Sequence, residues 1–164
     1  MELGTVEFER QVERATAASP PRSRDSYRRI LLGYNGTDSA RVALDRVAAV
    51  ATPESEVTVI TVIAFEAVGA STDPIKDSDR TWQWNCLVDA TARLRQFGID
   101  PYIEAAAGNP AAVIVETAES LGVDLVIVGA GRSRRWHPKL KHKPVRWTLE
   151  RRLACDALVV HSVA

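Results

Sequence analysis

Two stretches of this chain carry residue types that suit phosphate binding. The apolar run Leu125–Val128 is followed by Gly129 and Gly131, and residues 132–146 then hold seven Lys or Arg and two His without an acidic residue. Glycine lets backbone N–H groups approach a phosphate oxygen closely, because it adopts conformations that side chains obstruct. Cationic side chains can add charge-assisted hydrogen bonds to the same oxygens.

The basic segment 132–146 leaves more than one interpretation open. Its cations could bind the phosphates of an anionic ligand, or the segment could be a solvated surface loop that binds nothing. Binding of a polyanion is a third interpretation, although the chain's formal net charge of zero gives no general attraction to nucleic acid. The cations that would contact phosphate in the first interpretation are Arg132, Arg134, Arg135 and Lys139.

No catalytic or metal-binding constellation is visible. His137, His142 and His161 have no spacing to cysteines or carboxylates that suggests a metal site or a triad. The two cysteines, Cys86 and Cys155, both lie in apolar patterns, which favours buried, inert thiols. We therefore expect no catalytic residue and no metal ligand.

The elements that must position the glycines alternate along the chain. Apolar, β-branched runs predict strands, and apolar residues at intervals of three and four predict helices. Asn109 and Pro110 open one helix and Gly122 closes it, which is the clearest pair of boundary signals. The expected strands are 29–33, 56–65, 102–106, 123–128 and 156–161, and the expected helices are 40–51, 79–97, 110–121 and 145–154.

This alternation predicts an α/β fold, a doubly wound, five-stranded parallel sheet flanked by four helices. A chain of 164 residues with 46% hydrophobic and 26% charged residues fits one domain, expected at 28–164. Residues 1–27 look like an N-terminal extension and linker, either a flexible tail or a segment that packs on a partner. We see no secretory signal and no membrane span, so a cytoplasmic location is expected.

The order of signals resembles the universal stress protein family. Ile30–Ala40 is similar to the family's first strand and Asp-Gly-Ser loop, and Gly108-Asn109-Pro110 is similar to the start of its third helix. Val123–Gly129 is similar to its fourth strand, and Cys155–Val160 to its closing strand. The resemblance covers residues 28–162 and implies an adenine-nucleotide α-hydrolase-like sheet in a non-catalytic stress-response module.

The family's nucleotide signature, Gly-x-x-Gly, nine residues and Gly-Ser or Gly-Thr, is degenerate in this chain. Arg132 stands where the second glycine belongs, and the closing pair falls near Lys143 and Pro144, which has no N–H to donate. Asn35 replaces the Asp of the first loop. The resemblance thus implies weak or absent binding of ATP or another adenine nucleotide, with Mg²⁺ where ATP is bound.

A bound nucleotide would have its adenine and ribose over the first loop and the end of the second strand, with its phosphates toward the glycines of the fourth strand. The candidate binding residues are Gly33, Tyr34, Asn35, Thr37, Val62, Ile63, Gly129, Gly131, Arg132, Ser133, Arg134 and Arg135.

Two further expectations concern activity and assembly. Gly36-Thr37-Asp38-Ser39 is similar to the end of the nucleotide loop of ATP pyrophosphatase-type adenylating enzymes, which gives an enzymatic alternative. An exposed edge strand is an aggregation hazard unless it is paired or covered. In the resembled family the closing strand pairs with its twin, which implies a homodimer through Leu158–Val160; any other protein partner is unknown.

Overall fold

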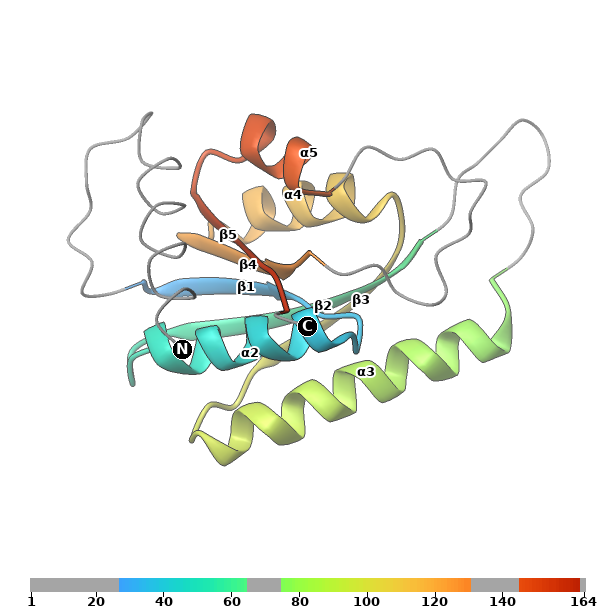
Figure 1. The fold of residues 1–164 in the computed structure, drawn as a ribbon, viewed down its shortest axis with the longest axis horizontal. Helices are drawn as coiled ribbons and strands as arrows, with labels where there is room; N and C mark the ends of the chain where they lie inside the picture. Colours follow the sequence, from blue (N-terminus) through green and yellow to red (C-terminus); the bar gives the residue numbers. More distant parts are fainter. Residues whose placement is uncertain (1–26, 65–74, 131–144, 163–164) are drawn as a thin grey trace.

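The computed structural model describes residues 27–64, 75–130 and 145–162 (Figure 1). Helices and strands alternate throughout this part of the chain, as the sequence predicts. In order they are β1 (Arg29–Gly33), α2 (Asp38–Val50), β2 (Glu56–Ala64), α3 (Asp77–Gln96), β3 (Tyr102–Gly108), α4 (Pro110–Leu121), β4 (Leu125–Gly129), α5 (Val145–Arg152) and β5 (Asp156–Val160).

The sheet has the strand order β3-β2-β1-β4-β5, and every pair of neighbours is parallel. Helices α2 and α3 cover one face, and α4 and α5 cover the other (Figure 1). The predicted doubly wound fold is therefore confirmed. Some boundaries differ: α3 begins two residues earlier than predicted, at Asp77, and β3 continues to Gly108 instead of ending at Ala106.

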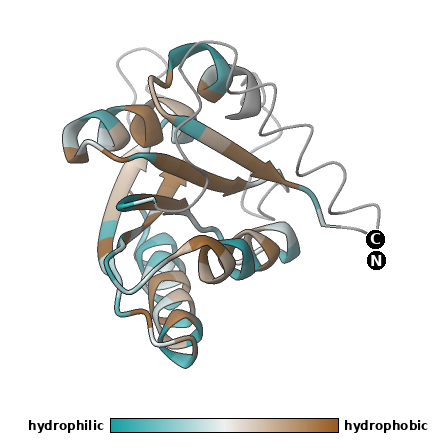
Figure 2. Cartoon of the chain, turned by 90° about the vertical axis from the view of Figure 1, so that its left-hand side faces the viewer, coloured by the Kyte–Doolittle hydropathy of each residue, from teal (hydrophilic) through white to brown (hydrophobic). Residues whose placement is uncertain are grey.

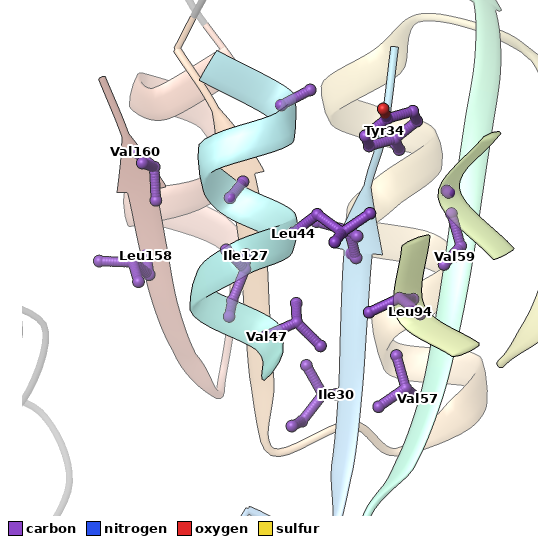
Figure 3. Close-up of a cluster of buried hydrophobic side chains, with 14 of the residues drawn as sticks. Ile30, Tyr34, Leu44, Val47, Val57, Val59, Leu94, Ile127, Leu158 and Val160 are labelled. Carbon is purple, nitrogen blue, oxygen red and sulfur yellow. The ribbon is translucent and has the colours of Figure 1, made fainter. Parts of the chain in front are cut away.

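Alternation along the central strands divides the core into two layers. Ile30 and Leu32 face α2 and α3, whereas Leu31 between them faces α4 and α5. Buried strands with apolar residues on both faces are the norm in parallel sheets covered by helices. Figure 3 shows the first layer, in which Leu44 and Val47 of α2 pack among side chains of several strands. Figure 2 shows strands of the sheet coloured largely as hydrophobic, whereas the flanking helices vary between hydrophobic and hydrophilic along their length.

Local chemistry sets the ends of α2 and α4. The Thr37 side chain accepts a hydrogen bond from the Ala40 N–H, and the Asn109 side chain accepts one from the Ala112 N–H. Each oxygen thereby satisfies one N–H group that has no partner within its helix. Gly122 ends α4 with a φ of 61°, a left-handed conformation that favours glycine. These predicted boundaries are confirmed.

The inner face of α3 ends before Phe97. Phe97 is 56% exposed, because it follows the last helical residue where the chain leaves α3 toward β3. The buried residues of the face are Gln83, Cys86, Leu87, Ala90 and Leu94.

Several expectations are not tested by the described residues. The side chains of Leu158, Val159 and Val160 are 5–8% exposed within the single chain, and the homodimer through them stays a prediction. Residues 1–26 of the expected N-terminal extension lie outside the described part. Cys86 is buried and Cys155 is partly buried. In the described residues, no helix combines the length and apolarity that crossing a membrane requires.

Candidate functional site

The direction in which the chain adds strands to the sheet reverses once, between β1 and β4. The carboxyl ends of these two strands therefore form a switch point. From β1 the chain winds outward through β2 to β3, and then returns across the sheet to β4 and outward to β5. Open α/β sheets bind ligands at such a switch point, because the loops there leave toward opposite faces. Gly33 and Gly129 end the two strands, so both lie at this position.

The first loop, residues 34–37, is closed by its own hydrogen bonds. Asn35 Oδ1 accepts from the Thr37 N–H at 3.2 Å and from the Thr37 hydroxyl at 2.7 Å. Thr37 Oγ1 in turn accepts from the Ala40 N–H at 3.2 Å. Gly36 between them has a φ of 75°, as the Asn-Gly turn requires. The Asn35 side-chain oxygen therefore stabilises the loop that leads into α2. A ligand that bonds to this oxygen would compete with the two hydrogen bonds from Thr37.

Tyr34 lies in the loop, and its side chain is buried in the core. The ring is 2% exposed and packs in the first core layer (Figure 3). Its hydroxyl donates to Asp89 Oδ2 of α3, and Arg93 Nε donates to Asp89 Oδ1 at 2.9 Å. The Tyr34 hydroxyl is therefore occupied by a partner within the chain. Asp89 and Arg93 lie one helical turn apart, a spacing that can indicate their ion pair in the sequence but gives no signal for the bond to Tyr34.

These contacts shift two pKa values. Burial, followed by the hydrogen bond to Asp89, raises the pKa of the Tyr34 phenol to about 12. Burial alone would raise the pKa of the Asp89 carboxyl, but hydrogen bonds from Tyr34 and Arg93 outweigh it and lower this pKa below its ordinary value. The phenol is thus a neutral donor at physiological pH, and the carboxylate is its ionised acceptor.

Gly129 is fixed by close packing against the amino end of α2. A Cβ atom built there would lie 2.5 Å from Ala40 N and 2.6 Å from Ser39 C, both of which are backbone atoms. The Ser39 side chain is itself buried next to this position. The first turn of α2, with the positive end of its helix dipole, therefore lies directly over the end of β4.

The end of β2 contributes less exposed surface to the candidate site than the sequence predicts. Ile63 is buried, and Val62 is partly buried against the second core layer. Gln83 of α3, which the sequence did not single out, lies beside this end: its Nε2 donates to Thr61 O at 2.6 Å and to Ala106 O at 2.7 Å. Thr61 Oγ1 donates to Tyr34 O at 2.8 Å. The carboxyl ends of β1, β2 and β3 are thus joined by side-chain hydrogen bonds.

Replacing Gln83 by leucine should lower the free energy of unfolding by about 2 kcal/mol, because a buried amide loses its hydrogen bonds to two carbonyl oxygens. Urea denaturation measures the change. Gln96→Leu, the same substitution at an exposed position of α3, should change stability by less than about 0.5 kcal/mol. Equal effects of the two substitutions would show that the bonds at Gln83 contribute nothing.

The remaining candidate binding residues, Gly131 and the run Arg132–Arg135 with Ser133, lie outside the described residues. Of the candidates that are described, the structure brings together Gly33, Asn35, Thr37 and Gly129 around the switch point. Within residues 27–64, 75–130 and 145–162, no group of three or more His, Cys, Asp or Glu side chains could hold a metal ion.

The geometry defines the class of protein: a parallel α/β domain with a glycine-ended switch point beneath a helix amino terminus. Residues 26–161 match the universal stress protein family, which is most of the chain, and the protein belongs to this family. The resemblance drawn from the strand and loop motifs is therefore confirmed. No curated protein matches at a significant level.

Solved structures agree on the fold. A universal stress protein in complex with cAMP is 23% identical, with a TM-score of 0.61, and the match covers 84% of this chain and 99% of that one. An Arabidopsis thaliana family member with AMP bound is 13% identical, with a TM-score of 0.60 and coverage of 84% and 93%. A universal stress protein from Archaeoglobus fulgidus is 19% identical, with a TM-score of 0.62 and coverage of 82% and 99%.

Proposed function

We propose that this protein is a non-catalytic stress-response module that binds an adenine nucleotide weakly at the β1–β4 switch point and acts as a homodimer. The observation that carries the proposal is the placement of Gly129 under the first turn of α2. The positive end of the α2 helix dipole favours an anion at this position. Similar folds with cAMP and AMP bound support an adenine nucleotide as the ligand.

Weak binding follows from the hydrogen bonds within the first loop. The Asn35 side-chain oxygen, a polar group of the loop expected to lie under the adenine, already accepts hydrogen bonds within the chain. A ligand gains little from a group that must first give up a bond of equal strength. The phosphates would be bound by the α2 terminus and by the basic segment after Gly131, and Mg²⁺ would accompany ATP.

Calorimetric titration with AMP, cAMP and ATP, the last with and without Mg²⁺, tests this proposal. We expect heat with at least one nucleotide and a dissociation constant above about 10 µM, since a loop closed on itself offers few free hydrogen-bonding groups. Binding should weaken as salt is raised, because charged side chains attract the phosphates. Absence of heat with all three nucleotides at low salt would rule out the nucleotide site.

Asn35→Asp is the sharpest variant, because it restores the residue type of the resembled family. A carboxylate keeps the bonds from Thr37 and makes a stronger, charge-assisted bond to an amino group of the base, so affinity should rise about fivefold. Asn85→Asp, the same change at an exposed position of α3, should leave the affinity unchanged. A loss of affinity in Asn35→Asp would place the base elsewhere.

The alternative, an adenylating enzyme, requires residues 36–39 to serve a reacting ATP. In the structure Thr37 caps α2, and the Ser39 side chain is buried beside Gly129, so both hydroxyls serve packing and capping. This favours binding over catalysis. Release of pyrophosphate from ATP, followed with a coupled phosphate assay, would support the enzyme instead.

A further inference from the structure

Gln83 of α3 joins the carboxyl ends of β2 and β3 from within the core. Its side chain is 8% exposed, and Nε2 donates to Thr61 O at 2.6 Å and to Ala106 O at 2.7 Å. Both N–H groups of the amide are therefore used. In the register of the sheet Val62 lies beside Ala106, so the amide bridges the two strands next to Val62. Because residues 102–105 of β3 are exposed, this bridge secures a strand pair that side-chain packing protects little.

The same helix also contacts the first loop. A Cβ atom at Gly36 would lie 3.3 Å from Cys86 Sγ, and Cys86 is one turn of α3 beyond Gln83. Asp89, a further turn along, accepts the hydrogen bond from the Tyr34 hydroxyl. Residues three apart are neighbours on a helix surface, so adjoining side chains of α3 support both the first loop and the end of β2. The Gln83 amide is thus fixed in position relative to the loop.

The main chain of Val62 extends past the point where β1 stops pairing. The Tyr34 N–H donates to Ile60 O at 2.9 Å, so the main-chain groups of Ile60 and, by the alternation of a strand, of Val62 point toward β1. The pairing of β1 with β2 ends at Gly33 and Ile60. Tyr34 O accepts from the Thr61 hydroxyl at 2.8 Å. The N–H and C=O of Val62 therefore face the space beyond β1, where the proposed function puts the base.

We propose that Gln83 is a positioning residue for recognition of the base, an inference that rests on the proposed function. A neighbouring N–H and C=O match the acceptor and the amino group on one edge of adenine. Guanine carries an acceptor and a donor at the exchanged positions, so it is rejected by a site that holds the base in one orientation.

The bonds of Gln83 supply that constraint. By bonding to Thr61 O and Ala106 O, the amide holds the end of β2 at a fixed distance from the first loop. Without these bonds the Val62 main chain can shift, and a shifted strand end admits either base in more than one orientation. Gln83 thus acts through Val62 and does not need to touch the nucleotide.

Gln83→Met in the full chain removes both N–H donors and nearly keeps the length of the side chain. Calorimetric titration uses whichever of AMP, cAMP and ATP binds the wild type most tightly, together with its guanine counterpart. The dissociation constant of the adenine nucleotide should rise about tenfold, and the preference for adenine over guanine should fall about threefold.

Val57→Ala is the control for lost stability. Val57 lies near the opposite end of β2 and is 2% exposed, so its truncation also destabilises the fold. Titrations are made below the melting temperature of each variant, with circular dichroism showing each one folded. The affinity and the base preference of Val57→Ala should stay within about twofold of the wild type.

Gln83→Glu separates positioning from packing. Its carboxyl group has nearly the shape of the amide, but it donates a hydrogen bond only when it is protonated. Relative to the wild type at the same pH, the nucleotide affinity of Gln83→Glu should therefore be low at alkaline pH and recover partly at mildly acidic pH. Gln83→Met should keep a constant ratio to the wild type at both.

The outcomes distinguish the role of Gln83 from the proposed function. If the wild type binds no nucleotide, the proposed function is wrong and the role of Gln83 with it. If the wild type binds an adenine nucleotide while Gln83→Met keeps the same affinity and base preference, the role of Gln83 alone is wrong. Equal losses in Gln83→Met and Val57→Ala would also overturn it, because the effect would then follow from destabilisation.

Discussion

Replacing Gly129 by alanine should lower the free energy of unfolding by about 3 kcal/mol, one of the larger effects of any single substitution in this chain. The added methyl group would lie 2.5 Å from Ala40 N and 2.6 Å from Ser39 C. Both contacts are with backbone at the start of a helix, which cannot rotate away as a side chain can. Either α2 must move off the sheet or β4 must shift its register with β1.

Gly98→Ala is the matched control for that substitution. Gly98 has a φ of 77°, so alanine there is strained, but a Cβ atom would meet nothing within 4 Å. Its cost should be about 1 kcal/mol, the penalty of the left-handed conformation alone. Chemical denaturation of both variants gives the comparison. If Gly129→Ala costs no more than Gly98→Ala, the close packing of α2 on β4 is incorrect.

Gly129→Ala should also change nucleotide binding. Because Gly129 fixes the first turn of α2 over the end of β4, displacing that helix removes its N–H groups from the proposed phosphate position. Gly129→Ala should therefore lose nucleotide binding, and at temperatures where it stays folded the loss should persist. Calorimetric titration below the melting temperature separates this loss from unfolding.

Tyr34→Ala should be as damaging, with a loss of about 4 kcal/mol, because it empties a fully packed aromatic site. The ring is 2% exposed, and its hydroxyl is bonded to Asp89. Tyr34→Phe keeps the packing and removes the hydrogen bond, so its cost should be about 1.5 kcal/mol. Tyr102→Phe, at a position that is 66% exposed, is the control and should change stability little.

The pH dependence of stability identifies the contribution of the Tyr34–Asp89 bond. The pKa of Asp89 is lowered in the folded protein, so its contribution is complete above the ordinary value of 3.8 and is lost as the pH falls through the lowered pKa. The pKa of Tyr34 is raised to about 12, so its contribution is complete below 10.0 and is lost as the pH rises toward 12.

Tyr34→Phe should therefore flatten both ends of the pH profile of unfolding, since it removes one group and the main partner of the other. Wild type and variant should differ most near neutral pH and converge at the extremes. Thermal melting across the pH range measures this. A constant difference at all pH values would mean that the hydroxyl acts through packing alone.

The amino-acid sequence determined the elements and their order. Alternating apolar strands and periodic helices, with the caps at Thr37, Asn109 and Gly122, are local signals, because each depends on residues within a few positions of one another. Right-handed crossovers then leave few arrangements for a parallel sheet. The same signals placed Gly33 and Gly129 at the ends of strands, and so near a common edge.

Tertiary structure decided what those residues touch. The sequence grouped Tyr34 with the binding residues, but its ring enters the core, because Asp89, 55 positions away, lies where its hydroxyl needs an acceptor. From the sequence, the glycine at position 129 is explained by the close approach of a phosphate. In the structure, the amino end of α2 already leaves no room for a side chain at this position. Gln83 had no sequence signal, since its partners are carbonyl groups on two other strands.

The exposure of the two edge strands is also decided by the tertiary structure. The two edge strands, β3 and β5, both carry apolar residues. No local sequence pattern indicates which of them keeps its side chains exposed. The packing of the helices on the sheet settles it: the side chains of Leu158–Val160 in β5 are buried on both faces, whereas residues 102–105 of β3 stay exposed. Exposure depends on contacts between elements far apart in the chain, and these exist only once the sheet is assembled.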